Sequence, residues 1–184
     1  MLITKTNPVG EDVPIQKLQS FIHGQLVTKW GLAGANDTLY QCYGKAYRNK
    51  QDNAYIAEVY TGSNEYKEVY WNDELKAISW FGLSGAIRHD IIEQVAVHLV
   101  FFVNLEKLKP SITHRADAEV RKDVLDIIGS GRFGLKYEST ELWIENVLRE
   151  YPGSRRDDRL KAVDMHPIHC FRLNFQLKFD KNNC

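Results

Sequence analysis

Apolar and polar residues alternate without a break near the C-terminal end of the chain. Every odd position from 171 to 179 is Phe or Leu, and the even positions are Arg172, Asn174, Gln176 and Lys178. A period of two puts the apolar side chains on one face of a β-strand and the polar ones on the other. We therefore predict a strand over residues 168–179 whose polar side chains, Arg172 included, point outward.

A second strand is predicted over residues 94–105, and it is apolar on both faces. The odd positions from 95 to 103 are all Val, Leu or Phe, and Ala96, Val100 and Phe102 lie at even positions. Strands of this composition are typically covered on both sides, as in the middle of a sheet. His98 lies on the second face, where we interpret it as a buried neutral histidine with one hydrogen-bond partner. We expect both predicted strands to lie near the centre of the sheet.

Three segments show helical spacing of apolar residues. The first covers residues 13–30, with Asp12 placed to cap the helix and Pro14 in its first turn. The other two are recognised by their apolar positions: Ala116, Val120, Val124 and Ile128 in a helix that Gly129 should end, and Trp143, Ile144, Val147 and Leu148 in a helix that follows Ser139.

Short β-prone segments separated by turn residues fill the region between the first helix and the strand over 94–105. They cover residues 38–48, 54–61, 66–71 and 76–81, and hairpin-length breaks favour an antiparallel meander. The prediction is an α+β fold: an antiparallel sheet of about five or six strands with three helices packed mainly on one face. No linker or repeat interrupts residues 1–184, which we expect to form one domain.

The composition limits the kinds of partner. The chain has 184 residues, and its 24 basic side chains balance 24 acidic ones, so no overall positive field attracts nucleic acid. Three cysteines far apart give no disulfide framework. The first residues contain no apolar run of signal-peptide length, and the longest apolar run is about half a membrane span. We expect a protein made in the cytoplasm, with no membrane contact.

Two motifs resemble a dinucleotide-binding site and a metal site, but the elements predicted around them do not fit either site. The glycines at 129, 131 and 134 match the dinucleotide-binding spacing, but a predicted helix precedes them where a strand is required. His166, His169 and Cys170 are close in sequence, yet His169 and Cys170 would point to opposite faces of a strand, so a metal site is not predicted. We assign no catalytic, cofactor-binding or metal-binding residue and expect no enzymatic activity.

The order of elements carries a family resemblance. A helix, antiparallel strands, a strand reading His98-Leu-Val-Phe-Phe-Val-Asn104, two helices and a closing strand containing Phe171-Arg-Leu-Asn-Phe follow one another. This order resembles tail-completion or tail-terminator neck proteins of tailed bacteriophages, with crAss-like phages as one candidate source.

The resemblance implies a non-enzymatic structural protein of the virion, made in the host cytoplasm. Such a protein forms a homo-oligomeric ring, a hexamer or dodecamer, at the head-tail junction as a tail terminator or connector ring. Its partners would be copies of itself and the adjacent connector, portal or tail proteins. Genomic DNA would pass through the lumen without sequence-specific contact, and no cofactor is implied.

Two loops are the natural arms for reaching a neighbour, residues 49–53 and 153–161. The second contains a run of mixed charge that we predict to form intersubunit pairs: Arg155, Arg156, Asp157, Asp158 and Arg159. The same run also fits an ordinary solvated surface loop. Two other functions remain open. A deep apolar pocket would favour a small α+β binding module of cellular origin, and a perturbed carboxylate or histidine in a cleft would favour an enzyme without a recognisable motif.

Overall fold

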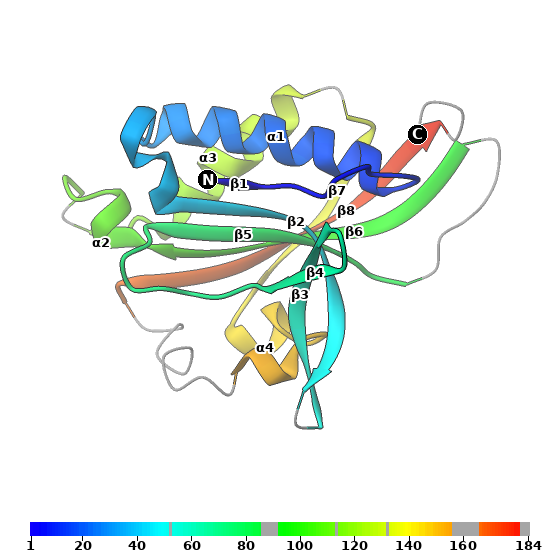
Figure 1. Ribbon diagram of the computed structural model, residues 1–184. Helices are drawn as coiled ribbons and strands as arrows, with labels where there is room; N and C mark the ends of the chain where they lie inside the picture. The colour runs from blue at the N-terminus through cyan, green and yellow to red at the C-terminus, as the bar shows by residue number, and fades with distance from the viewer. Residues whose placement is uncertain (52, 86–91, 113, 132, 156–165, 181–184) are drawn as a thin grey trace.

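The chain folds around one mixed β-sheet (Figure 1). The computed structural model describes residues 1–184 apart from 52, 86–91, 113, 132, 156–165 and 181–184. The sheet has eight strands in the order β4-β3-β2-β5-β6-β8-β7, with β1 beside β2. Its strands are β1 (Leu2–Ile3), β2 (Tyr40–Gln51), β3 (Ala54–Gly62), β4 (Glu65–Glu68), β5 (Ala77–Leu83), β6 (Ile92–Asn104), β7 (Leu135–Leu142) and β8 (Ile168–Asp180).

The two strands predicted most clearly from the sequence form the longest pairing in the sheet. β6 and β8 are each 13 residues long and pair antiparallel along their whole length, from Ile92 opposite Asp180 to Asn104 opposite Ile168. Both are interior strands, although β8 lies only one strand from the edge. The expectation that β6 is covered on both faces is confirmed, because Leu99 on one face and Val100 on the other are both fully buried.

The α+β class is confirmed, but the antiparallel meander is wrong. β2 pairs in parallel with both β1 and β5, so the sheet is mixed. After β4, the chain returns to the other side of β2 instead of adding a further strand. The predicted strand over 66–71 is cut short because Val69, Trp71 and Leu75 turn inward and are buried in the core, which anchors this return.

The sheet has eight strands and not the predicted five or six, because two were missed: β1, which has only two residues, and β7, whose sequence carries little apolar signal. Residues 135–142 were expected to lead into a helix after Ser139, whereas they form the edge strand β7, which pairs antiparallel with β8. The β7 side chains are exposed or half-buried. The strand therefore forms because it pairs with β8, and not because it buries an apolar face. The predicted helix survives as the single turn α4 (Ile144–Val147).

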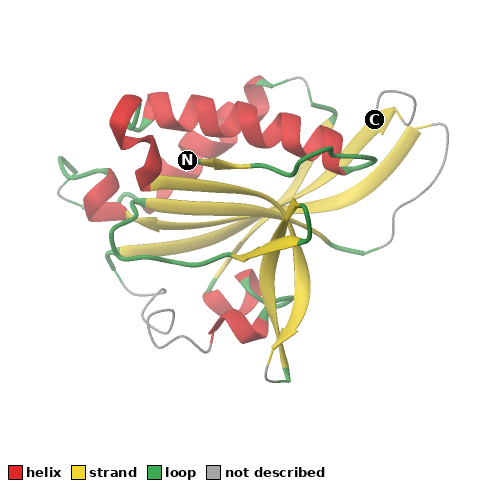
Figure 2. Cartoon of the chain, in the orientation of Figure 1, coloured by secondary structure: helices red, strands yellow, loops and turns green. Residues whose placement is uncertain are grey.

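The helices are divided between the two faces of the sheet (Figure 2). α1 (Asp12–Lys29) and α3 (Asp117–Ser130) cover one face, as expected, while α4 and the 3-10 turn η2 (Pro152–Arg155) lie on the other. The prediction of three helices mainly on one face is therefore wrong for the third. α2 (Leu105–Leu108) and the 3-10 turn η1 (Gly34–Leu39) connect strands and helices.

Two apolar clusters form the core, one on each side of the sheet. On the α1/α3 side, the rings of Phe101 and Phe171 stack with centroids 5.0 Å apart. On the α4 side, Trp80 and Phe102 stack with centroids 5.4 Å apart, and Val147 of α4 belongs to the same buried cluster. Offset stacking of this kind adds about 0.5–1.5 kcal/mol to the burial of each pair.

Helix α1 is positioned by an apolar stripe. Ile15, Leu18, Ile22 and Leu26 are each at most 1% exposed, which confirms the predicted helix. Asp12 does not cap it, however. Asp12 is the first helical residue, and its carboxylate pairs with Lys5 and Lys45 instead.

A β-hairpin projects from the body of the molecule (Figure 1). Strand β2 first pairs with β5, and its second half leaves the body and pairs with β3, from Ala46 opposite Val59 to Gln51 opposite Ala54. We call residues 46–59 the arm. Its tip carries exposed Arg48 and Lys50. Of residues 49–53, predicted as a reaching loop, 49–51 are the last residues of β2 and lie at this tip, and residue 52 is outside the described residues.

Gly82 of β5 allows a close approach between three elements. It pairs with His98 of β6, and a Cβ atom at this position would lie 2.1 Å from His98 Nε2 and 2.6 Å from Tyr151 Oη. Both side chains are almost completely buried and cannot move aside freely. Only glycine leaves room for the His98 and Tyr151 side chains above β5.

We therefore expect Gly82→Ala to lower the free energy of unfolding by about 1–3 kcal/mol, because the added methyl group displaces buried rings. Urea denaturation followed by circular dichroism measures this. Gly24→Ala is the matched control, since a Cβ at Gly24 meets nothing within 4 Å and helical alanine is favoured by roughly 0.5–1 kcal/mol. Equal stability of the Gly82→Ala and wild-type proteins would contradict the packing described here.

Candidate functional site

The predicted interface run begins on the arm. In η2, a Cβ added to Gly153 would lie 2.7 Å from the Tyr55 carbonyl oxygen, and the Ala57 backbone N–H donates to Ser154 Oγ at 3.2 Å. η2 therefore packs directly on β3. Arg155 ends η2, although its side chain is not described, and Arg156, Asp157, Asp158 and Arg159 lie outside the described residues. The two segments predicted to reach a neighbour thus start side by side.

The arm exposes aromatic and basic side chains together. Tyr55 is 38% exposed, and the Arg48 guanidinium lies 4.1 Å from the centroid of its ring. Tyr66 and Tyr70, on and just after the neighbouring strand β4, are also exposed. Tyrosine and arginine are enriched at protein–protein interfaces, where they supply contact area together with polar groups.

The outer strands of the sheet are poorly suited to strand addition. β4 has only four residues, all exposed, and three of them are charged: Glu65, Lys67 and Glu68. β7 carries Lys136 and Glu138, and its pairing register shifts between Tyr137 and Ser139. Short length, charge and irregular pairing are the devices that keep sheet edges from joining other edges. These two edges are therefore poorly suited to pairing with a strand of another chain.

A cleft of about 310 Å³ lies between the start of α3 and the ends of β7 and β8. One wall is charged and comes from the beginning of α3, and the other is mainly apolar and comes from the two strands. The lining residues are Arg115, Asp117, Arg121, Leu142, Trp143, Ile168, His169 and Cys170. The volume is at the lower end of the range for small-ligand sites.

The polar groups of this cleft form a chain of contacts. Arg121 donates to His169 Nε2 at 2.8 Å, and because arginine can only donate, Nε2 is the unprotonated nitrogen. His169 Nδ1 then carries the proton and lies 3.3 Å from Asp117 Oδ1. Arg115 donates two hydrogen bonds to Asp117, at 2.7 and 3.0 Å, and these bonds lower the pKa of Asp117 although burial opposes the shift.

Trp143 stands at the apolar wall of the cleft and is 65% exposed. Its backbone has φ of 71°, a left-handed conformation that costs a bulky residue about 1–3 kcal/mol. Trp30, Trp71 and Trp80 are all buried, so Trp143 is the one exposed tryptophan of the four in the chain.

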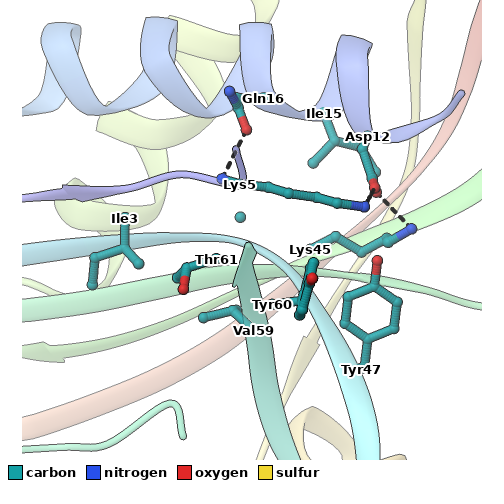
Figure 3. A pocket seen from close by; sticks show the side chains of 11 residues that line it. Ile3, Lys5, Asp12, Ile15, Gln16, Lys45, Tyr47, Val59, Tyr60 and Thr61 are labelled. Atoms are coloured by element: carbon teal, nitrogen blue, oxygen red, sulfur yellow. Dashed lines mark hydrogen bonds and ion pairs between the residues drawn. The ribbon is translucent and has the colours of Figure 1, made fainter. Parts of the chain in front are cut away.

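A second pocket lies between α1, β1 and the base of the arm (Figure 3). Lys5 and Lys45 both point toward Asp12, and Lys45 also donates to Glu11 at 2.9 Å. Burial opposes the charge on Lys45, but hydrogen bonds to Asp12 and Glu11 outweigh it and raise its pKa. The free volume is only about 10 Å³, which is room for roughly one water molecule. This network ties α1 to β1 and β2 and is structural.

The prediction that Arg172 points to solvent is wrong. Arg172 is fully buried, because α4, Tyr151 and Glu150 cover the second face of the sheet. Its guanidinium pairs with Glu150 through both terminal nitrogens, and it donates to Asn174 Oδ1 and Ser84 Oγ, each at 2.8 Å. The sequence pattern could not reveal this, since a single alternating strand does not show what lies above its polar face.

His98 is buried as predicted and joins this network. Its Nδ1 lies 2.8 Å from Ser84 Oγ, which confirms one hydrogen-bond partner. Burial, with the charge of Arg172 adding to it, lowers the pKa of His98 to about 3. Burial alone would raise the pKa of Glu150, but the hydrogen bonds and charge of Arg172 lower it to about 2. The imidazole is therefore neutral and Glu150 ionised.

A cavity of about 210 Å³ opens beside the network and is lined by Ser84, Glu141 and Arg149 among others, but neither His98 nor Glu150 lines it. The network holds Glu150 against Arg172, and Ser84 connects Arg172 to His98.

The glycine-rich motif at 129–134 and the His169–Cys170 pair do not form the sites that their spacing resembles. Helix α3 runs through Gly129, which was expected to end it, and ends at Ser130 with Gly131 as its C-cap; the next regular element after the glycines is β7. A dinucleotide site needs the opposite order. His169 stacks on Phe171 on one face of β8, while Cys170 lies in the cluster on the other face. Within the described residues no group of three or more His, Cys, Asp or Glu could hold a metal ion.

No family model, curated protein or solved structure matches this chain. Across the described residues, no helix is long and apolar enough to cross a membrane.

The pKa shifts predict acid sensitivity in two stages. The folded pKa of His98 lies below its unfolded value, so the unfolded chain binds more protons and stability falls as the pH drops from about 6.5 toward 3. Glu150 adds a second loss below about pH 4.5. Each group contributes a slope of at most about 1.4 kcal/mol per pH unit. Urea denaturation at pH 7.0, 5.5 and 4.5 measures the first stage, and His98→Gln should reduce its slope. An unchanged slope in this variant would refute the assignment.

Breaking the buried ion pair should be costly. We expect Arg172→Met to lower the free energy of unfolding by about 3–5 kcal/mol, because Glu150 keeps a charge without its main partner. The double variant Arg172→Met/Glu150→Gln should be more stable than Arg172→Met alone. Thermal and urea denaturation of the three proteins gives the coupling directly, and strict additivity of the two substitutions would contradict it.

Proposed function

We propose that this protein is a non-enzymatic structural subunit of a homo-oligomeric ring at the head-tail junction of a tailed bacteriophage. The observation that carries the proposal is the projecting arm, with η2, where the charged segment 153–161 starts, packed against strand β3 at Tyr55 and Ala57. An arm that leaves the body of one subunit can contact a different surface of the next. Such heterologous contacts form closed rings when the rotation between subunits allows closure.

The charges and edges of the molecule support the same proposal. The sequence of the arm contains two basic residues, Arg48 and Lys50, and two acidic ones, Asp52 and Glu58, so a neighbouring copy can pair with charges of either sign. Complementary patches of this kind set the register of an interface more than its affinity. Exposed Tyr55 supplies apolar contact area beside them. The ring is expected in the virion, with connector, portal or tail proteins above and below it.

Imaging and native mass spectrometry test the ring. The purified protein should form closed rings alone, or should remain monomeric and form rings on neck proteins from the same genome. A monomer that binds none of those components would refute the proposal.

Charge reversal tests which segment makes the contact. We expect Arg48→Glu/Lys50→Glu to reduce ring formation at least roughly tenfold. Arg155→Glu/Arg156→Glu should reduce it as well, because each double substitution removes charge complementarity between neighbouring subunits. Lys17→Glu/Lys122→Glu makes the same change in net charge on exposed positions of α1 and α3 and should leave assembly intact. If the Arg48→Glu/Lys50→Glu variant assembles like the wild-type protein, the arm is not part of the interface.

A further inference from the structure

The cleft beside α3 has features that the ring does not explain. Within the described part of the cleft, the charged wall holds two guanidinium groups and one carboxylate, which together carry a charge of +1. Asp117 occupies two donors of Arg115. Among the described residues, His169 is the one hydrogen-bond partner of the Arg121 guanidinium. The other N–H groups of this guanidinium make no hydrogen bond within the described part of the chain. The charge of Arg121 acts on Asp117, but Arg121 donates no hydrogen bond to it, so its remaining N–H groups can donate to an added oxyanion.

The apolar residues of the cleft indicate which kind of group the bound oxyanion belongs to. Leu142, Trp143 and Ile168 are apolar residues that line the same cleft as the guanidinium groups, and Trp143 is exposed. Leu142 packs against the α1/α3-side cluster and Ile168 against the cluster on the other face of the sheet. An indole ring offers a flat face to an aromatic group and favours offset or edge-on contact with it. A volume of about 310 Å³ accommodates one ring with its anionic substituent, and not a long chain.

We propose that this cleft binds a carboxylate attached to an aromatic ring, with the carboxylate on Arg121 and the ring against Trp143. A net charge of +1 complements a monoanion better than the dianion of a phosphate monoester. Nucleic acid is disfavoured because several phosphates must be neutralised for binding and the chain has no excess of basic residues. A free small aromatic acid and the aromatic C-terminus of a polypeptide share this chemistry.

Tryptophan fluorescence gives a local readout, because Trp143 is exposed and the other three tryptophans are buried. The full chain is titrated with N-acetyl-phenylalanine, with its uncharged amide, with phenylacetate and with AMP. N-acetyl-phenylalanine should change the fluorescence saturably, and the amide should bind at least roughly tenfold more weakly because it lacks the charge-assisted contact. Binding of phenylacetate as tight as that of N-acetyl-phenylalanine identifies a small acid as the ligand. Clear preference for N-acetyl-phenylalanine identifies a chain terminus.

Two variants separate the cleft from the rest of the surface. Arg121→Gln should weaken binding at least roughly tenfold, since the guanidinium fork is lost. Lys122→Gln removes the same charge from the adjacent, solvent-facing position and should bind like wild type. Unchanged thermal denaturation of both variants shows that the loss is not due to unfolding.

Three results would overturn the proposal: no saturable response to either carboxylate, equal binding of acid and amide, or tighter binding of AMP than of both carboxylates. None of these measurements depends on ring assembly, so the cleft and the ring can fail independently.

Discussion

The antiparallel pairing of β6 with β8 is the constraint on which the other elements depend. These strands are far apart in sequence, and joining them buries apolar side chains on both faces of β6 at once. One face then requires α1 and α3 as a cover, and the other requires α4 and η2. Both faces must be covered because exposing either would return large aromatic side chains such as Phe101 and Phe102 to water.

The second face combines packing with a buried charge. Arg172 lies opposite Val100 in the register of β6 and β8, and Glu150 reaches it from the segment between α4 and η2. An ion pair in this position contributes little net stability compared with an apolar pair, but it is costly to break. It therefore acts mainly as a constraint on position: Glu150 and Tyr151 must lie over β5 and β8. That placement in turn directs the following turn, η2, onto strand β3 of the arm.

The arm and the cleft lie on different parts of the molecule and suit different partners. The arm is a long, twisted hairpin whose exposed side chains can contact a surface of similar size, as a protein neighbour offers. The cleft is small and has one charged and one apolar wall, which suits a single group of mixed character. A protein could use both, one to assemble and one to bind a terminus or a small acid.

The local patterns of the sequence determined the interior strands, the first helix, the α+β class and the burial of His98, because these depend on period and composition alone. The parallel pairing of β2 with β5, the edge strand β7 and the burial of Arg172 were decided only by the tertiary structure. In each case the deciding partner is distant in sequence: Ala77 for Tyr40, Phe175 for Tyr137 and Glu150 for Arg172. The cleft was equally hidden, since it joins Arg121 to His169 across 48 positions. A hydrophobic pattern reports which face of an element is apolar, but not what covers its polar face.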